Sequence, residues 1–392
     1  MSAKKKLVSA IEGRKRVELT AEEIQIIEHR REHGVLPVSE TLQGRRKLDA
    51  LQRKLADSER ERKESIAMLD AAEERMGFVD EVRGNQGAVV VPTFHLPPTK
   101  ASDEVAPILQ FSDWHLEERV DPETINGLNE FNPEIASTRV RRAFERGLFL
   151  IERLRVGTKV DTCVVALLGD MITGYIHEEL QESNWLSPSE ATILAMNLIE
   201  EGLNFLDREG NFKRILVPCS IGNHGRTTEK IRISTAHKNS YEWLMYKMLE
   251  SKFAGNPRIK FQVSNGYHNW INLFGFPIRM HHGDAIRYKD GVGGPTIPIM
   301  KKISRWDHSQ KAHLDLFGHL HEHIAHNKFI MNGSLIGYNA YGQKMGCSYS
   351  VPQQTLVIID KRFGRQAVVP IYLERSKEIR HEEREAVTCR KT

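Results

Sequence analysis

Short apolar runs alternate with amphipathic stretches along the chain from residue 107 onward. Five of these runs have the length and composition of buried strands: PILQF (107–111), TCVVALL (162–168), RILVPCS (214–220), IRMH (278–281) and LDLF (314–317). Between the first two runs, an apolar stripe at helical spacing is formed by Val140, Phe144, Leu148, Ile151 and Leu154. Because strands and helices alternate, the pattern predicts an α/β fold for this part of the chain.

Capping residues and further apolar runs predict additional helices and strands. A helix is predicted to begin at Pro188, because Ser187 and Glu190 have capping-box spacing and proline is favoured at the first helical position. Further strands are predicted in KFIMNGS (328–334), TLVIID (355–360) and QAVVPIY (366–372). We therefore place the main domain at residues 107–375 and a charged C-terminal tail at residues 376–392.

Residues 1–83 form a charged region, rich in Lys, Arg and Glu and poor in aromatic residues. One helix is predicted over 19–34, between the Thr20 capping box and the stop at Gly34, and a second over 39–76. The second carries apolar residues near heptad positions at Leu48, Leu51, Leu55, Ile66, Leu69 and Met76.

Three interpretations of this helical N-terminal region stay open. It packs on its own domain, it is a dimerisation arm that makes a homodimer or recruits a protein partner, or it contacts nucleic acid. Residues 84–106 hold many turn-forming residues and are predicted to be a linker.

Composition narrows the class of protein. Charged residues make up 28% of the 392 residues and the net charge is only +4, so the whole chain is not a strongly basic nucleic-acid binder. The four cysteines have no C-x-x-C spacing, which indicates reduced thiols. No run approaches the roughly 18 apolar residues of a membrane helix. We expect a cytoplasmic protein that does not contact a membrane.

Polar clusters follow each of the five apolar runs. They are Asp113-Trp114-His115, Gly169-Asp170, Gly222-Asn223-His224, His282-Gly283-Asp284 and Gly318-His319-Leu320-His321. Ligands of open α/β folds gather at the carboxyl ends of strands, so we expect these clusters to converge. Carboxylate, amide and imidazole groups together form a mixed oxygen and nitrogen ligand set suited to divalent metal ions.

The ordered set D-x-H, G-D, G-N-H, H-G and G-H-x-H resembles the calcineurin-like metallophosphoesterase superfamily over about residues 105–345. It is similar to phage and bacterial members of the DNA-repair-exonuclease type. The resemblance implies a β-sandwich flanked by helices (αββα), here with an N-terminal helical appendage. It also implies two divalent metal ions, manganese first, with iron, zinc or mixed pairs fitting the same ligands.

The resemblance also implies the role of each motif residue. One ion would be held by Asp113, His115 and His321, and the other by Asn223, His282 and His319, with Asp170 as the bridge. A water or hydroxide between the ions would attack phosphorus in line. His224 would be the catalytic histidine, protonating the leaving oxygen or stabilising the transition state.

The chain departs from the family pattern after G-N-H. The family usually places an acidic residue there to orient the histidine, whereas this chain has Gly225 and Arg226. The orientation of His224 must then come from elsewhere. Arg226 would hold a phosphate oxygen as a second catalytic residue, or it is a surface arginine. Of the adjacent pair His281 and His282, we prefer His282 as the ligand because it directly precedes glycine.

Other side chains near the motifs have two interpretations each. His177 is either a substrate contact or a surface histidine, and Trp114 either stacks a base or packs in the core. Basic residues between the fourth and fifth clusters would suit a polyanion or belong to a solvated helix face: Arg287, Lys289, Lys301, Lys302 and Arg305.

Three functions follow from these observations. The first is a metal-dependent phosphodiesterase, specifically a nuclease acting on nucleic acid. Repair nucleases commonly carry a histidine shortly after G-D, and Asp170-Met-Ile-Thr lacks it. The second is a phosphatase or phosphodiesterase for a phosphoprotein, nucleotide or other small molecule. The third is a metal-binding scaffold with vestigial chemistry.

Overall fold

The computed structural model describes residues 103–155, 157–288 and 294–374, together with separate helical positions between residues 25 and 67. The chain divides into two compact units, Met1–Leu96 and Pro97–Thr392. In the first unit the described positions are helical, including 25–26, 28–29, 32–33 and 62–64. The predicted caps at Thr20 and Gly34 and the heptad leucines lie outside the described residues, as do most of the linker and the C-terminal tail. The four domain boundaries therefore stay predictions.

Two β-sheets form the centre of the second unit. The six-stranded sheet has the order β11-β10-β1-β2-β3-β4, in which β1 to β4 run parallel and β10 pairs antiparallel with both neighbours. Its strands are β1 (Val105–Phe111), β2 (Thr162–Leu167), β3 (Arg214–Cys219), β4 (Ile259–Val263), β10 (Gln353–Asp360) and β11 (Gly364–Tyr372).

The five-stranded sheet has the order β5-β6-β7-β9-β8, with β6, β7 and β9 parallel. Its strands are β5 (Asn269–Leu273), β6 (Phe276–Met280), β7 (Leu314–Phe317), β8 (Ile324–Ala325) and β9 (Phe329–Met331). The outer edges of this sheet are antiparallel pairs, β5 with β6 and β8 with β9.

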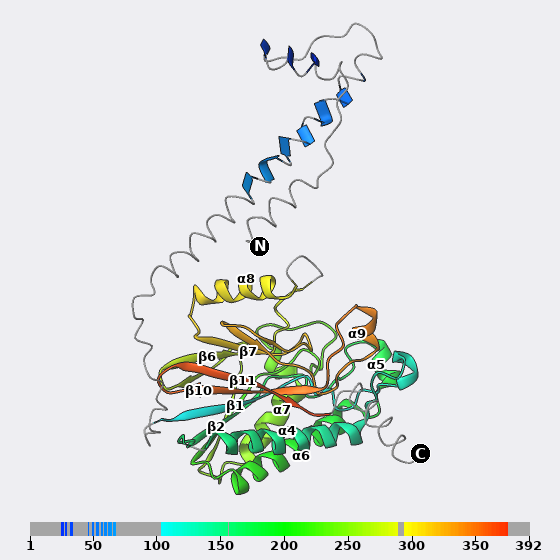
Figure 1. Ribbon diagram of the computed structural model, residues 1–392. Helices are drawn as coiled ribbons and strands as arrows, with labels where there is room; N and C mark the ends of the chain where they lie inside the picture. Colours follow the sequence, from blue (N-terminus) through cyan, green and yellow to red (C-terminus); the bar gives the residue numbers. More distant parts are fainter. Residues whose placement is uncertain are drawn as a thin grey trace, which may run out of the picture. The chain divides into compact units, whose positions relative to one another are not determined.

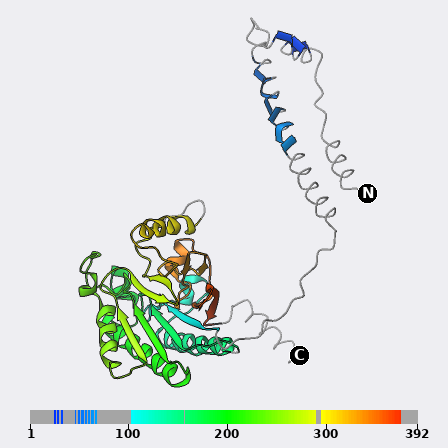
Figure 2. The same ribbon diagram turned by 90° about the vertical axis from the view of Figure 1, so that its left-hand side faces the viewer.

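Helices cover the outer face of each sheet (Figures 1 and 2). α4 (Pro133–Leu154), α6 (Pro188–Glu209) and α7 (Tyr241–Lys252) lie over the six-stranded sheet, and α8 (Thr296–Asp307) lies over the five-stranded one. The capping box predicted at Ser187 and Glu190 is present, and Asn132 caps α4. The described residues also include the shorter helices η1 (Pro122–Ile125), α5 (Glu178–Ser183), η2 (Ala236–Asn239) and α9 (Ala340–Lys344).

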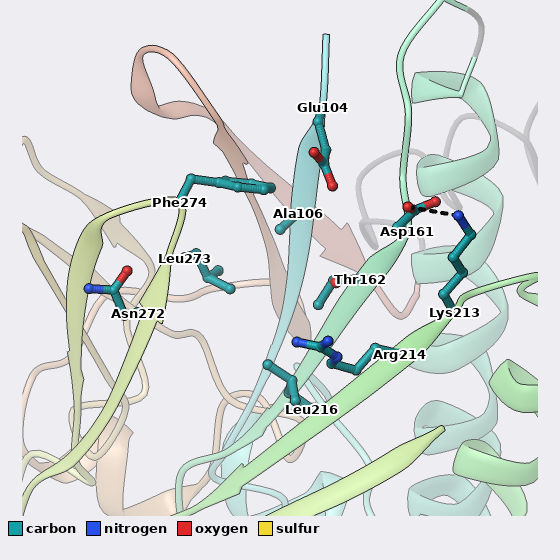
Figure 3. A pocket seen from close by; sticks show the side chains of 10 residues that line it. All are labelled: Glu104, Ala106, Asp161, Thr162, Lys213, Arg214, Leu216, Asn272, Leu273 and Phe274. Carbon is teal, nitrogen blue, oxygen red and sulfur yellow. Dashed lines mark ion pairs between the residues drawn. The ribbon is translucent and has the colours of Figure 1, made fainter. Parts of the chain in front are cut away.

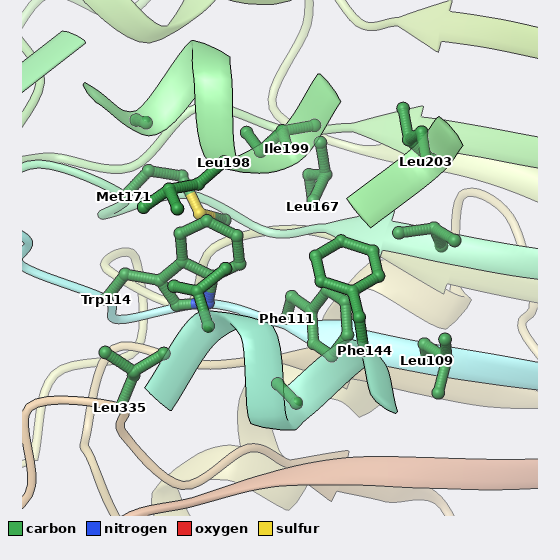
Figure 4. Packing of buried hydrophobic residues seen from close by; sticks show 14 of the residues in the cluster. Leu109, Phe111, Trp114, Phe144, Leu167, Met171, Leu198, Ile199, Leu203 and Leu335 are labelled. Atoms are coloured by element: carbon green, nitrogen blue, oxygen red, sulfur yellow. The ribbon is translucent and has the colours of Figure 1, made fainter. Parts of the chain in front are cut away.

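The inner strands are buried on both faces, which explains their continuous apolar runs. In β2, Cys163, Val165 and Leu167 pack toward the helices, whereas Val164 and Ala166 face the core between the two sheets. The helix-side core includes Phe111, Trp114, Phe144 and Leu203 (Figure 4). The architecture is helix, sheet, sheet, helix, and the predicted α/β class with an αββα sandwich is confirmed.

Some elements differ from the sequence prediction. β1 begins at Val105, so the last two residues assigned to the linker are strand. β4 and β5 were not predicted, because two of the five side chains in each are polar and neither strand has a continuous buried run. Within the described part of the chain, no helix is long and apolar enough to cross a membrane.

Candidate metal centre

The five polar clusters follow strands that end at one edge of the sandwich. β1, β2 and β3 are parallel neighbours in one sheet, and β6 and β7 are parallel neighbours in the other. Their carboxyl ends deliver all nine predicted site residues to this edge: Asp113, His115, Asp170, Asn223, His224, Arg226, His282, His319 and His321. The two sheets thus contribute to a single site.

The first ligand group combines Asp113, His115 and His321. Nε2 of His115 lies 3.1 Å from Nε2 of His321, which lies 3.5 Å from Oδ1 of Asp113. Each of these three side chains has one potential ligand atom, and the three atoms lie close enough together for a single metal ion to bind them all. They are the three residues that the family resemblance assigns to one ion.

The second ligand group centres on His282. Its Nε2 lies 2.8 Å from Oδ2 of Asp170, 3.1 Å from Oδ1 of Asn223 and 3.2 Å from Nδ1 of His319. Two imidazole nitrogens, a carboxylate oxygen and an amide oxygen therefore point at one another. This is the composition of a second divalent ion shell.

Asp170 lies between the two groups. Its ligand atoms cluster with His282 and His319 on one side and with His115 and His224 on the other. A carboxylate that reaches both the His282 group and His115 of the first ligand group is placed as a pair of neighbouring ions needs. The geometry fits the bridging role that the resemblance implies for Asp170.

Hydrogen bonds to the second ring nitrogen orient two of the histidines for metal binding. Nδ1 of His282 lies 2.9 Å from the Leu168 carbonyl oxygen and so donates to it, which leaves Nε2 with a free lone pair. Nδ1 of His115 pairs with the Thr173 hydroxyl at 3.1 Å. Such outer contacts fix the tautomer of metal-ligating histidines.

Burial controls the charge of the imidazoles. It lowers the pKa of His319 to about 4 and of His321 to about 3, so both are neutral near pH 7. Neutral imidazole is the form that binds a metal ion. For His282, burial acts in the same direction, but the neighbouring Asp170 charge and hydrogen bond outweigh it and raise the pKa to about 10. The buried carboxylates thus favour a positive charge next to His282. Bound divalent ions would supply such a charge.

The backbone is strained where the ligands are attached. Five ligand residues have left-handed φ angles between 49° and 72°: Asp113, His115, Asp170, His319 and His321. This conformation costs roughly 1–2 kcal/mol for a residue with a Cβ, and such strain concentrates at functional sites. The loops therefore adopt a conformation that the surrounding fold must hold in place.

Two glycines allow the carboxylates to approach the backbone closely. A Cβ on Gly222 would lie 2.0 Å from Oδ1 of Asp170, and one on Gly318 would lie 2.1 Å from Oδ2 of Asp113. Backbone N–H groups donate to the same carboxylates: His224 N–H donates to Asp170 at 2.8 Å, and His319 N–H donates to Asp113 at 2.9 Å. Steric clash with these carboxylates thus explains why the G-N-H and G-H-x-H motifs begin with glycine.

We expect Gly222→Ala to weaken divalent-ion binding at least about tenfold, because Asp170 must move to admit the new methyl group. The clash is also expected to lower the free energy of unfolding by about 1–3 kcal/mol. Calorimetric Mn²⁺ titration and thermal melting measure both effects. Gly255→Ala is the control, since its Cβ would meet no atom within 4 Å. Unchanged Mn²⁺ affinity in Gly222→Ala would contradict the steric argument.

His224 is oriented by a backbone carbonyl. Its Nδ1 lies 2.9 Å from the Thr173 carbonyl oxygen, so Nδ1–H donates and Nε2 is the nitrogen left for chemistry. The Thr173 loop is itself fixed by Glu117, whose buried Oε1 accepts from Thr173 N–H at 2.8 Å and Gly174 N–H at 2.7 Å. This contact supplies the orientation that Gly225 does not.

Arg226 makes three backbone contacts. Its guanidinium donates to the carbonyl oxygens of Asn223, Thr228 and Glu229, at 2.7, 3.0 and 3.3 Å. These bonds shape the loop that follows His224. They occupy one hydrogen on each guanidinium nitrogen, so the predicted phosphate contact would use the remaining donors.

The other side chains considered near the motifs lie either in the core or on the surface. His281 is fully buried, with its ring stacked on Phe317 and its Nε2 3.5 Å from Asp315, away from the ligand groups that His282 joins. Trp114 is also fully buried and donates from Nε1 to Gln354, so it packs in the core (Figure 4). His177 is exposed, 6.5 Å from the His224 ring. Lys301 and Arg305 are exposed on α8.

Sequence analysis missed two buried carboxylates beside the site, Glu117 and Glu242. Burial raises the pKa of Glu117 to about 7 and of Glu242 to about 8. Glu117 lies two residues after His115, and that closeness to a motif was a usable signal. Glu242 lies in α7, whose weak apolar and polar periodicity did not indicate in the sequence that this glutamate is buried.

A separate cavity of about 370 Å³ lies at the opposite ends of the strands (Figure 3). Thr162 and Arg214, the first residues of β2 and β3, line it, whereas the metal ligands follow the last residues. Its rim contains an ion pair between Asp161 and Lys213 at 3.1 Å. The cavity is therefore distinct from the candidate metal centre.

Comparison with known proteins adds distant structural likenesses. No protein-family model and no curated protein matches the sequence. An archaeal phosphodiesterase is 13% identical, with a TM-score of 0.30 over 68% of this chain and 99% of that one. Zinc-bound Vps29 from Entamoeba histolytica is 12% identical, with a TM-score of 0.27 over 68% and 99%. A dimetal phosphatase from Danio rerio is 11% identical, with a TM-score of 0.33 over 69% and 99%.

Because these identities and TM-scores are low, the resemblance rests on the chain's own residues. The ordered motifs occupy the ends of parallel strands in an αββα sandwich and converge on one edge. In fold and motif set, the chain resembles the calcineurin-like metallophosphoesterases, which are metal-dependent phosphoester hydrolases.

Proposed function

We propose that the chain is a dimetal phosphoester hydrolase that acts on phosphodiesters of nucleic acid. The position of Asp170, which groups with His282 and His319 and also with His115 of the first ligand group, carries the proposal. Two bound divalent ions would supply an acidified water for in-line attack and would neutralise charge on the phosphoryl oxygens. Manganese is the metal we propose, while iron and zinc also suit this set of nitrogen and oxygen ligands.

The protein's own groups have distinct roles in this proposal. Asp113, His115 and His321 would hold one ion, and Asn223, His282 and His319 would hold the other. His224 presents Nε2 to the leaving oxygen, since its Nδ1–H donates to Thr173. Proton transfer from that nitrogen would assist departure of the leaving group.

An exposed aromatic residue near the metal ligands supports a nucleic-acid substrate. Trp185 is 53% exposed, and its backbone N–H donates to the carbonyl of Glu117, two residues after His115. The guanidinium of Arg119 lies 5.2 Å from the centre of its ring. An indole face paired with a cation suits stacking on a base and contact with a phosphate.

Basic residues also follow the catalytic histidine. Lys230, Arg232 and Lys238 are exposed in the segment between His224 and α7. Positive charge beside the site would attract a polyanionic backbone by neutralising its phosphates. The charge and the aromatic face together favour a nucleic acid over a small phosphomonoester.

The first test compares hydrolysis of bis-p-nitrophenyl phosphate with that of p-nitrophenyl phosphate, with Mn²⁺ and with EDTA. We expect a Mn²⁺-dependent preference for the diester, followed by cleavage of labelled DNA or RNA. Preference for the monoester would instead favour a phosphatase acting on phosphoproteins or small molecules. No Mn²⁺-dependent rate on either ester or on nucleic acid would favour the scaffold function.

We expect Trp185→Ala to raise the KM for single-stranded DNA about tenfold, because stacking contributes about 1–3 kcal/mol per base. Hydrolysis of bis-p-nitrophenyl phosphate should change less, since that ester carries no nucleobase beyond the scissile phosphate. Phe149→Ala is the matched control: Phe149 is 55% exposed on α4 and also has an arginine, Arg153, over its ring. Equal KM values for the two variants would argue against a stacking role.

A further inference from the structure

A buried glutamate from α7 reaches the metal centre from outside the five motifs. Glu242 is the second residue of α7, and its side chain is fully buried. Burying a carboxylate is costly unless hydrogen bonds satisfy both oxygens. Its place in the first helical turn is favourable for a negative group, but its main contacts come from other loops.

Glu242 joins the two loops that carry the bridging and amide ligands. Oε1 accepts from Met171 N–H at 2.6 Å, directly after Asp170, and Oε2 accepts from Gly222 N–H at 2.6 Å, directly before Asn223. Each carboxylate oxygen thus accepts a hydrogen bond from a backbone amide. The carboxylate holds the ends of β2 and β3 in fixed register at the site.

Gly225 leaves the space that Glu242 fills. A Cβ at position 225 would lie 2.7 Å from Cγ and 3.0 Å from Cδ of Glu242. The two segments are also tied directly, since Tyr241 N–H donates to the Gly225 carbonyl at 2.9 Å. An acidic side chain at position 225 and the glutamate at position 242 would therefore compete for one volume.

We propose that Glu242 is a positioning residue that, from α7, fills the space beside Gly225 and fixes the two loops that carry Asp170 and Asn223. It sets the positions of Asp170 and Asn223 by binding the amides of Met171 and Gly222. The inference rests on the proposed dimetal function, because it concerns the same site. Glu242 itself touches neither a metal ion nor the substrate in this role.

The experiment moves the carboxylate from one element to the other. Glu242→Ala leaves two buried amides without an acceptor and is expected to weaken Mn²⁺ binding and lower kcat by about 10- to 100-fold. Adding Gly225→Glu to that variant returns a carboxylate to the vacated space and should restore at least tenfold of the lost affinity. Gly225→Gln with Glu242→Ala is the matched control, which has similar bulk but no charge.

Mn²⁺ binding by calorimetry and electron paramagnetic resonance is measured alongside thermal melting and turnover. Wild-type Mn²⁺ affinity in Glu242→Ala would overturn the proposal, and so would equal affinity in the two double variants. If Glu242→Ala does not fold, Glu242→Gln carries the test: it keeps the shape, loses one acceptor, and should bind Mn²⁺ at least about tenfold more weakly. Unchanged affinity there would overturn the role of the carboxylate.

The binding readout separates this inference from the proposed function. A wild-type protein that binds two Mn²⁺ ions and hydrolyses no phosphoester would end the hydrolase proposal. The role of Glu242 would still be decided by the Mn²⁺ affinities of the variants.

Discussion

Replacing Asp170 by alanine is expected to abolish Mn²⁺-dependent hydrolysis of bis-p-nitrophenyl phosphate, with a loss of at least about a thousandfold in kcat. Asp170 groups with His282 and His319 and also with His115 of the first ligand group, and it accepts the backbone N–H of His224. Its removal therefore disturbs both ion sites and the catalytic loop together. Metal analysis after gel filtration should show fewer than two Mn²⁺ ions per chain.

The matched control lies at the other end of the same strand. Asp161 precedes β2 and forms ion pairs with Lys159 and Lys213 at 2.7 and 3.1 Å. Exposed pairs of this kind contribute about 0–1 kcal/mol, so Asp161→Ala should keep both metal content and kcat. Two Mn²⁺ ions and substantial turnover in Asp170→Ala would contradict the assignment of Asp170 as the shared ligand.

Replacing His224 by alanine is expected to lower kcat by about 10²- to 10⁴-fold while leaving Mn²⁺ binding within about twofold. The effect should depend on the leaving group. A nucleoside oxygen needs protonation as it departs, so a DNA substrate should show the full loss. p-Nitrophenolate leaves readily without a proton, so bis-p-nitrophenyl phosphate should lose less.

His177→Ala controls for loss of a nearby imidazole. His177 is exposed and its ring lies 6.5 Å from that of His224, so its removal should change kcat by less than about threefold. Equal losses on DNA and on the p-nitrophenyl diester in His224→Ala would favour transition-state stabilisation over protonation of the leaving group. A wild-type rate on DNA would remove His224 from the catalytic machinery.

The features predicted well from sequence are those with a local signature. Strands such as β2 are buried on both faces, so their apolar runs are continuous and their ends are easy to locate. The motif residues follow directly at those ends, and parallel pairing then brings them to one edge. Helix caps such as Ser187 with Glu190 also depend on nearby residues alone.

The features that were missed depend on tertiary contacts. β4 and β5 lie at the borders of the sheets, contain two polar residues each and lack a continuous apolar run. The partner of His224 is the Thr173 carbonyl, and a backbone group has no residue identity to recognise. Glu242 becomes important only because α7 carries it to the loops after β2 and β3.

The two ligand groups also have a mechanical consequence, because each draws side chains from both layers of the sandwich. Asp113 and His115 extend from β1 whereas His321 follows β7, and Asn223 follows β3 whereas His282 follows β6. Each bound ion would cross-link the two sheets at the edge where their apolar core ends. Ions that bind only the folded edge add their binding free energy to the stability of the fold. The free energy of unfolding would therefore rise with the concentration of free metal ion.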